Sequence, residues 1–357
     1  MSQSRPWTDK YAPRRFEDIS AQTDVVHLLQ AHVGDADKVR ALPHLLLYGP
    51  PGIGKTTCID LLIRHLYGHL DKTDLQRSVL SLNASDDRGI AVVRSKITPF
   101  AKREPVSGTP FKLIVLDECD NMTSEAQDAM RRTMETYAET TRFALMCNYL
   151  SRVAPPIASR CHKARFKAIT GDAMVRHLRS IAEREHFACS DAVLREIDRV
   201  VGGDMRAALN LMQALSVFWG DRVRPEHVAD AFADCPASVI DELFCACVEE
   251  QSTFHAVQLA CRNAVRSEGY AGAVVLRRLA SRLIDERTAL PELLQARALQ
   301  SVAQAEYAMS KGGDEYLQLF AVAAQLYRAT RDRTPFHTTV SQRPRVSFDI
   351  SSLRIDQ

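Results

Sequence analysis

Several features that would define other classes of protein are missing from this chain. Its 9 cysteines include no C-x-x-C pair, and only Cys245 and Cys247 stand close together. Residues two apart on a helix face different ways, so neither a zinc site nor a disulfide framework is expected. Reduced thiols in a cytosolic or nuclear protein are the plain interpretation.

Long apolar runs and a marked excess of one charge are absent as well. No run approaches the length of a membrane span, and residues 1–7 do not have the pattern of a signal peptide, so no membrane partner is expected. The formal net charge of +2 means that any contact with DNA must come from a local cluster. With 357 residues, 46% hydrophobic and 25% charged, the chain has the composition of a globular protein with two or three domains.

A phosphate-binding motif is the most specific feature that is present. Residues 49–56 (GPPGIGKT) fit G-x-x-x-x-G-K-[ST], with a strand-like run before them and helix-forming residues after them. In such a loop, backbone N–H groups and the helix N-terminus face the phosphates. Lys55 would reach the terminal phosphates, and the Thr56 hydroxyl would hold Mg²⁺. A chance glycine loop is improbable in these surroundings, so the chain is expected to bind a nucleoside triphosphate.

Strand-like and helical patterns alternate around this motif. The strand-like runs are residues 45–48, 79–82, 111–116, 143–147 and, more weakly, 164–166. Such alternation predicts an α/β fold with a parallel sheet covered by helices. Ser124 and Gln127 have the spacing of a capping box at the start of one of these helices.

Only helical patterns follow Phe166. Residues 171–187, 190–201 and 204–219 predict a small helical domain, and five later segments carry apolar stripes for packing: 237–251, 253–267, 270–286, 291–310 and 314–328. The predicted organisation is an α/β domain (1–166), a helical domain (167–234), a second helical domain (235–330) and a loose tail (331–357).

Two carboxylates end the third predicted strand. Asp117 would hold Mg²⁺ beside the phosphate loop, and Glu118 would polarise the water that attacks the γ-phosphate. An ordinary acidic loop would explain this stretch if it stood alone. The phosphate loop upstream makes that alternative improbable.

Three further residues are weaker candidates for the same chemistry. Asn148 ends the next strand, where it could orient the attacking water, although asparagines there are commonly turn formers. Arg160, on a proline-rich segment, and Arg206, in the helical domain, offer guanidinium groups to the charge that develops in phosphoryl transfer. A surface salt bridge is the alternative for either arginine alone.

Together these motifs resemble those of a known family. Residues 6–13, 49–57, 82–90, 116–120, 159–161 and 203–210 have the order and spacing of AAA+ clamp-loader small subunits. Over about residues 7–328 the chain is similar to the small subunits of eukaryotic replication factor C. Within that family, residues 86–88 and 147–151 favour one particular type of small subunit.

The resemblance implies a fold, a cellular role and partners. The fold would be an AAA+ P-loop domain with a parallel five-stranded sheet, a helical lid domain and a helical collar that assembles five subunits. The function would be that of a nuclear ATPase, active in the heteropentamer, that opens a sliding clamp and loads it onto primer–template DNA in replication and repair. Its cofactors would be ATP and Mg²⁺.

The resemblance also implies roles for single residues. Asn148 and Arg206 would be the two sensors of the nucleotide, and Arg160 would act in trans on the ATP of the adjacent subunit. With Lys55 and Glu118 they form the expected catalytic set. The residues expected to contact ATP are Trp7, Tyr11, Pro13, Gly49, Pro50, Pro51, Gly52, Ile53, Gly54, Lys55, Thr56, Thr57, Asn148 and Arg206.

Two positions depart from the family pattern. Ala12 stands where the family commonly has arginine, so the contact made there is lost or is replaced, with Arg14 as the nearest substitute. Cys119 stands where the family usually has alanine, between Glu118 and Asp120. That change is small and should leave both carboxylates in place.

Contacts with DNA and clamp are expected on one segment. Arg88, Arg94 and Lys96 would meet DNA phosphates, with a solvated basic helix face as the alternative. Ile97 and Phe100, three residues apart, would enter a groove of the clamp, and core packing explains them equally well.

Two other functions fit parts of the pattern. A scaffold subunit would bind nucleotide without useful turnover, but the intact Lys55, Asp117 and Glu118 argue against it. A different AAA+ DNA motor, such as a branch-migration helicase, would carry a winged DNA-binding domain in place of the helices after Pro236.

Overall fold

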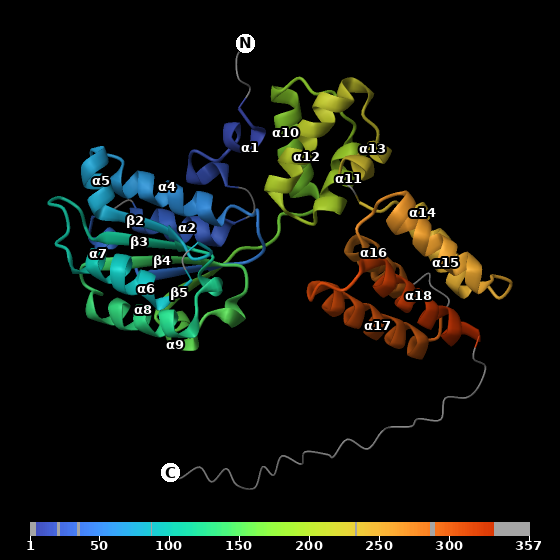
Figure 1. The fold of residues 1–357 in the computed structure, drawn as a ribbon. Helices are drawn as coiled ribbons and strands as arrows, with labels where there is room; N and C mark the ends of the chain where they lie inside the picture. The colour runs from blue at the N-terminus through green and yellow to red at the C-terminus, as the bar shows by residue number, and fades with distance from the viewer. Residues whose placement is uncertain are drawn as a thin grey trace, which may run out of the picture. The chain divides into compact units, whose positions relative to one another are not determined.

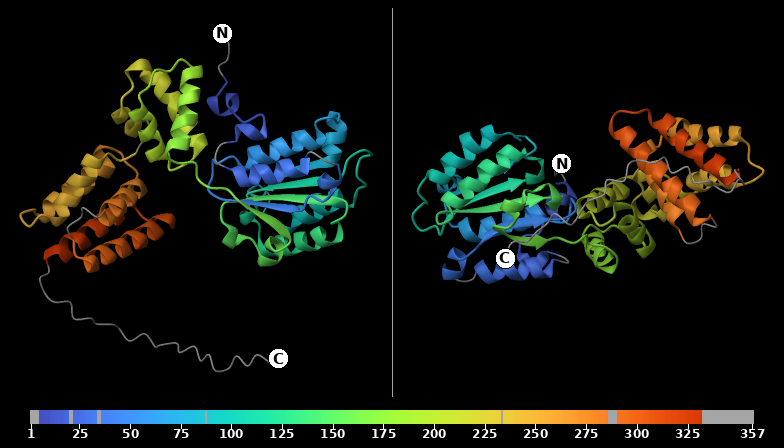
Figure 2. Two further views of the ribbon diagram at one scale, coloured as in Figure 1. Left: turned by 180° about the vertical axis from the view of Figure 1, so that it is seen from behind. Right: turned by 90° about the horizontal axis from the view of Figure 1, so that it is seen from below.

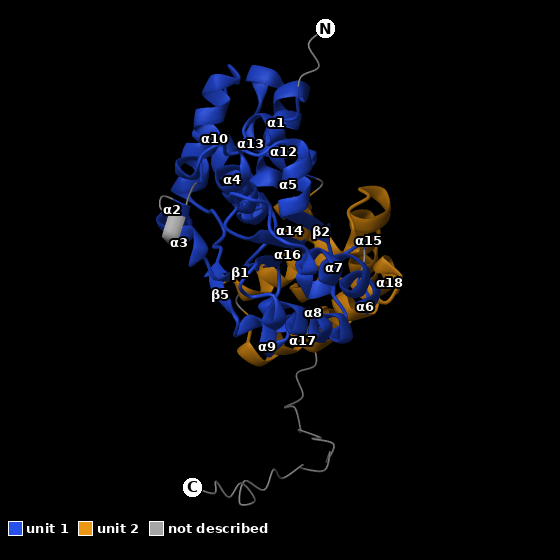
Figure 3. Cartoon of the chain, turned by 90° about the vertical axis from the view of Figure 1, so that its left-hand side faces the viewer, with its two compact units in different colours: residues 1–233 blue, residues 234–357 orange. Residues whose placement is uncertain are grey.

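The computed structural model describes residues 5–19, 22–33, 36–86, 88–232, 234–285 and 290–331. The chain divides into two compact units, Met1–Ala233 and Asp234–Gln357, which Figure 3 colours separately. The tail predicted for residues 331–357 lies outside the described residues except for Arg331, which ends a helix.

A five-stranded parallel sheet forms the middle of the first unit (Figure 1), in the order β2-β3-β4-β1-β5. Neighbouring strands pair in parallel throughout, so their carboxyl ends meet at one edge. The expected parallel α/β sheet is confirmed, although its last strand begins at Cys161, earlier than predicted. The strands are β1 (His44–Tyr48), β2 (Val79–Asn83), β3 (Lys112–Asp117), β4 (Thr141–Cys147) and β5 (Cys161–Arg165).

Helices cover both faces of this sheet, as Figures 1 and 2 show. On one face α2 (Thr23–Val33) and α4 (Lys55–Tyr67) pack against the strands, and on the other face α8 (Ser124–Thr136) does so. Strands buried on both faces appear in sequence as continuous apolar runs, which is why the runs predicted them. The shorter helices of this region are α1 (Trp7–Lys10), α3 (Ala36–Arg40), α5 (Lys72–Ser78), α6 (Ile90–Val92), α7 (Thr98–Lys102) and α9 (Pro155–Ala158), together with η1 (Phe16–Asp18), η2 (Val93–Ile97), η3 (Cys119–Asn121) and η4 (Leu150–Arg152).

The start of α8 differs from the prediction. Thr123, not Ser124, is the N-cap, and its hydroxyl accepts from the Ala126 N–H at 3.3 Å. The Gln127 side chain is buried and accepts from the Ala154 N–H at 2.7 Å, away from the cap. The predicted capping box is therefore wrong, because the residue before Ser124 has the extended backbone that a cap requires.

The remainder of the first unit is helical, and we refer to it as the lid. It contains α10 (Asp172–Arg184), α11 (Asp191–Val201), α12 (Met205–Phe218) and α13 (Pro225–Ala231) with the short η5 (Gly220–Arg222). The sequence predicted the first three of these helices and missed α13. Pro225 begins α13, and the Trp219 ring stacks on His227 with centroids 4.9 Å apart. Seven residues give too short a window for a helical period to show.

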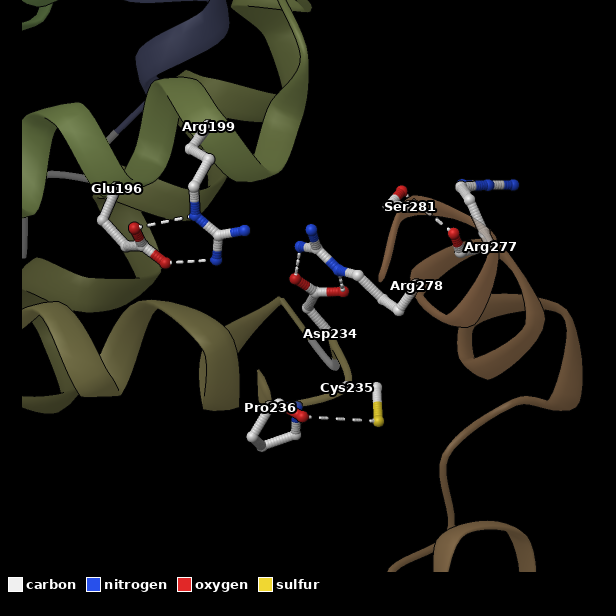
Figure 4. A network of polar contacts seen from close by, with 8 residues as sticks. All are labelled: Glu196, Arg199, Asp234, Cys235, Pro236, Arg277, Arg278 and Ser281. Atoms are coloured by element: carbon white, nitrogen blue, oxygen red, sulfur yellow. Dashed lines mark hydrogen bonds and ion pairs between the residues drawn. The ribbon is translucent and has the colours of Figure 1, made fainter. Parts of the chain in front are cut away.

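The second unit contains the five predicted helical segments: α14 (Ala237–Val248), α15 (Phe254–Arg262, continued by η6, Asn263–Ser267), α16 (Gly272–Ile284), α17 (Glu292–Ser310) and α18 (Glu315–Arg331). Its first residue, Asp234, is buried and accepts two hydrogen bonds from Arg278 of α16, one from Nε at 2.9 Å (Figure 4). This bidentate pair fixes the beginning of the unit to its own core. No helix among the described residues is both long and apolar enough to cross a membrane.

A buried lysine joins the sheet to α7. Lys112 of β3 has no exposed surface, and its Nζ donates to the carbonyl oxygens of Ala101 (2.6 Å), Phe100 (3.2 Å) and Arg103. These carbonyls belong to the end of α7, where unpaired acceptors and the helix dipole both favour a cation. Lys112 is therefore the C-terminal cap of α7.

We expect Lys112→Met to lower the free energy of unfolding by about 2–4 kcal/mol, because three buried carbonyls would lose their donor. Urea denaturation of the full chain measures the change. Lys102→Met, at the exposed end of the same helix, is the matched control and should cost less than about 0.5 kcal/mol. Equal effects of the two substitutions would contradict the capping role.

Candidate nucleotide site

The phosphate loop lies between β1 and α4, and its shape depends on glycine. Gly52 has φ +69°, and a Cβ there would overlap the Asp204 carboxylate, 1.8 Å away. Gly49 has φ +148°, and a Cβ there would lie 2.3 Å from the Phe166 carbonyl oxygen. Any other residue at these two positions would clash, so this path of the loop requires glycine at both.

Lys55, the first residue of α4, is buried in this loop. Its Nζ donates to the carbonyl oxygens of Gly49 (2.7 Å) and Pro50 (2.7 Å) and to Asn148 Oδ1 (2.9 Å). Burial lowers the pKa of Lys55, and the Asp117 carboxylate nearby opposes that shift. Phosphate oxygens are stronger acceptors for an ammonium than neutral carbonyls, so a triphosphate fits this cradle.

Thr56 and Asp117 meet at the carboxyl edge of the sheet. The Thr56 hydroxyl donates to Asp117 Oδ2 at 3.0 Å, and the Glu118 N–H donates to Asp117 Oδ1 at 2.8 Å. Hydroxyl and carboxylate oxygens are the ligands that Mg²⁺ prefers. The pair therefore fits a magnesium ion.

Glu118 is held by two residues that the sequence did not single out. The Ser85 hydroxyl and the Asn121 amide (3.0 Å) both donate to Glu118 Oε2, and the Glu118 backbone is left-handed with φ 52°. A glutamate in that conformation is strained, and such strain is typical of functional sites. Only Asn121 has a local signal, three residues beyond Glu118; Ser85 comes from the loop after β2.

A cavity of about 480 Å³ opens beside the loop, between it, the N-terminal segment and the lid. Residues 52–57, Tyr11, Pro13 and Arg206 of the predicted set line it. The N–H of Met205, at the start of α12, donates to the Gly52 carbonyl at 3.1 Å and so joins the lid to the loop. Outside this lining lie Gly49, Pro50, Pro51 and Asn148. All of these except Pro51 accept a hydrogen bond from Lys55.

A glutamate of the lid holds the N-terminal segment. The Tyr11 hydroxyl and Lys10 Nζ both donate to Glu185 Oε1, each at 2.6 Å. Burial raises the pKa of Tyr11, and the hydrogen bond from Lys10 lowers the pKa of Glu185. Sequence gave no signal for Glu185, because it is 174 residues away from Tyr11.

Trp7 does not belong to the cavity lining, and its predicted contact with the nucleotide stays a prediction. Its ring is buried in the hydrophobic core of the lid with Met174 and Leu178, and its backbone N–H donates to Gln213 Oε1 at 3.0 Å. A large aromatic ring gains more from full burial among helices than from a partly open cavity wall. Trp7 anchors the segment that carries Tyr11.

Arg160 is absent from the cavity lining as well. It is partly exposed just before β5, donates to the Pro156 carbonyl at 2.6 Å and forms an ion pair with Glu135 of α8. Arg131 shares that carboxylate at 3.3 Å. The guanidinium is thus held at the surface of the first unit, where another molecule can reach it.

The predicted DNA contacts lie on one exposed segment. Arg88, Arg94 and Lys96 are all exposed, and Arg88 Nε donates to the Ser85 carbonyl at 3.3 Å. This last contact places Arg88 next to the residue that bonds Glu118.

The two residues predicted to contact the clamp are buried. Ile97 and Phe100 are only 0% and 4% exposed, and both pack in the core beneath the sheet with Met130 and Met134 of α8. Their three-residue spacing faces them inward along α7 and η2, where burial of apolar surface is favourable. Core packing, the alternative considered above, is the observed outcome.

Two family models match the chain, one in each unit. Residues 45–168 match the "ATPase family associated with various cellular activities (AAA)", and residues 235–325 match the "Replication factor C C-terminal domain". The fold and the site therefore define an AAA+ α/β domain followed by helical domains, a class that implies nucleotide binding. This confirms the predicted fold class.

Related proteins that match most of the chain identify its family more precisely. "Replication factor C subunit 2" of Oryza sativa is 36% identical over 92% of this chain and 96% of its own, and "Replication factor C subunit 4" of Homo sapiens is 36% identical over 89% and 87%. "Replication factor C small subunit" of Sulfurisphaera tokodaii is 37% identical over 90% and 94%. The chain belongs to the replication factor C small-subunit family.

Solved structures share the fold at much lower identity. Two variants of RuvB from Thermotoga maritima have TM-scores of 0.50 and 0.51, with 17% and 16% identity. Each alignment covers 76% of this chain and 91% or 92% of the RuvB chain. Identity this low indicates a common architecture and nothing about function.

We expect Glu185→Ala to weaken the binding of an ATP analogue by about three- to tenfold, because Tyr11 would lose the acceptor that holds it at the cavity. Titration calorimetry with the full chain measures the dissociation constant. Glu183→Ala, at an exposed position of the same helix, is the matched control. Unchanged affinity in the Glu185 variant would show that this contact does not position the cavity wall.

Proposed function

We propose that this chain is an ATP-hydrolysing subunit of a clamp loader, the complex that opens a sliding clamp and loads it onto primer–template DNA. The observation that carries the proposal is the completeness of the site: Lys55, Thr56, Asp117 and Glu118 converge around one loop. The chain also belongs to the replication factor C family. The names of its relatives refer to replication, and this supports a role in DNA replication.

Each residue has a distinct part in this reaction. Lys55 would bind the terminal phosphates, while Thr56 and Asp117 would hold a Mg²⁺ ion that neutralises phosphate charge. Glu118 would accept hydrogen bonding from the attacking water, and Asn148 would orient that water or the γ-phosphate. Arg206, from the lid, would place a positive charge at the same phosphate.

We expect Glu118→Gln to reduce steady-state ATPase of the assembled complex at this site by about a hundredfold or more, because the amide no longer attracts a proton from water. Binding of ATP should remain, since the amide oxygen still accepts from Ser85 and Asn121. The assay contains the clamp and primed DNA, and the contribution of this site is read against the wild-type complex.

The matched control is Glu125→Gln, at an exposed position of the next helix. If Glu118→Gln left turnover unchanged, the chain would instead be a scaffold that binds nucleotide and serves its neighbour through Arg160. The completeness of the site favours hydrolysis.

We infer further that Arg160 acts in trans, on the nucleotide of an adjacent subunit. Support comes from its absence from the lining of this chain's own cavity and from its exposure beside Glu135. A guanidinium supplied by a neighbour stabilises the charge that develops during phosphoryl transfer.

We expect Arg160→Ala to leave ATP affinity at this chain's site unchanged while lowering turnover at the neighbouring site by about a hundredfold or more. A complex in which only the neighbour can hydrolyse ATP isolates that effect. Arg131→Ala, which removes the other partner of Glu135, is the control. Loss of ATP binding by this chain itself would contradict the assignment.

The partners proposed for the chain are the other replication factor C subunits, the sliding clamp and primer–template DNA, in the nucleus. Arg88, Arg94 and Lys96 are exposed and suited to sequence-independent phosphate contact. Ile97 and Phe100 are buried, so the proposal does not use them as clamp contacts. The match of residues 235–325 to a replication factor C domain favours this assembly over a branch-migration helicase.

The type of small subunit is a separate question. Residues 86–88 and 147–151 favour the subunit numbered five in mammals and three in budding yeast, and Asp87 lies outside the described residues. The rice and human relatives above carry the numbers 2 and 4 instead. Mass spectrometry of the purified native complex distinguishes these types, because the subunit missing from the companions is the one this chain supplies.

A further inference from the structure

Asp120 is a buried carboxylate whose position the hydrolysis scheme above does not explain. It lies on η3, two residues beyond Glu118, with 9% of its surface exposed. Its Oδ2 accepts from the backbone N–H groups of Asn148 (3.3 Å) and Tyr149 (3.1 Å), which follow β4. The carboxylate thus bridges two loops at the edge of the sheet where the nucleotide site lies.

The ladder between β3 and β4 ends before this point. Its last paired residues are Leu116 and Leu145, so the chain beyond β4 has no backbone partner on the β3 side. Backbone N–H groups that have no ladder partner there can be satisfied by a side-chain acceptor. The Asp120 carboxylate provides it and connects the β3 side to Asn148 and Tyr149, which lie three and four residues beyond Leu145.

The other oxygen of Asp120 is not engaged by these two hydrogen bonds. Asp120 Oδ1 is buried without a hydrogen-bond partner among the described residues. A buried carboxylate with one unsatisfied oxygen is costly, and such groups call for a functional explanation. The functional explanation concerns Asn148. Asp120 accepts a hydrogen bond from the Asn148 backbone, and the Asn148 side chain accepts one from Lys55 Nζ at 2.9 Å.

We propose that Asp120 is a positioning residue: it fixes the backbone of Asn148 so that the Asn148 side chain stays within hydrogen-bond distance of Lys55. Glu118 and Asp120 belong to the same turn, so the turn that carries the hydrolytic carboxylate also sets the position of the nucleotide sensor. This inference deepens the proposed function and rests on it for its effect on turnover.

The first test is a double-mutant cycle in the assembled complex with clamp and primed DNA. Asp120→Ala is expected to lower kcat about tenfold with little change in the KM for ATP, as is Asn148→Ala. The double variant should be no slower than Asn148→Ala alone, because Asp120 acts through Asn148. Multiplied effects in the double variant would overturn the proposal.

Conservative and matched variants separate positioning from folding. Asp120→Asn keeps an oxygen for both N–H groups and should stay within about threefold of the wild-type kcat. Asp128→Ala removes a carboxylate at an exposed position of the adjacent helix and should leave kcat unchanged. If Asp120→Asn were as slow as Asp120→Ala, the two hydrogen bonds would not be the cause, and the proposal would fail.

A second test does not depend on hydrolysis. Hydrogen exchange of the full chain, read on a peptide that covers residues 147–150, should be at least about tenfold faster in Asp120→Ala than in the wild type and unchanged in Asp120→Asn. Equal protection in all three chains would refute the contact. If the wild-type complex did not hydrolyse ATP, the proposed function would fail, while this exchange experiment would still decide the role of Asp120.

Discussion

The nucleotide site depends on keeping one buried ammonium satisfied. Lys55 is desolvated by the loop that surrounds it, and an unpaired charge in such a place would unfold the loop or lose its proton. Its three acceptors come from the turn after β1 and from the residue after β4. A parallel sheet makes this possible, because it brings the carboxyl ends of neighbouring strands to one edge. Thr56, Asp117 and Glu118, the other predicted functional residues, lie at the same edge of the sheet.

Local patterns were sufficient for the sheet and the loop. The strands are buried on both faces, so they appear as apolar runs, and the loop's glycines and lysine have fixed spacing. The same patterns could not decide the role of Ile97 and Phe100. An apolar residue at helical spacing looks the same whether it anchors a partner or packs in a core, and both side chains are buried in the core.

Contacts between distant segments were beyond sequence reasoning. Ser85 meets Glu118 because β2 and β3 are neighbours, and Glu185 meets Tyr11 because the lid folds against the N-terminal segment. Neither contact corresponds to a regular spacing along the chain, so neither could be predicted from the sequence. Asp120 was visible in the acidic stretch after β3, but its partners became apparent only once the ends of β3 and β4 were seen side by side.

The anchoring of Trp7 in the lid has a thermodynamic consequence. Because this ring and the Tyr11–Glu185 bond join the N-terminal segment to the lid helices, the wall that Tyr11 and Pro13 contribute to the cavity is attached to those helices. Linkage is reciprocal: any shift of the lid helices that weakens the binding of nucleotide is opposed by bound nucleotide with the same free energy.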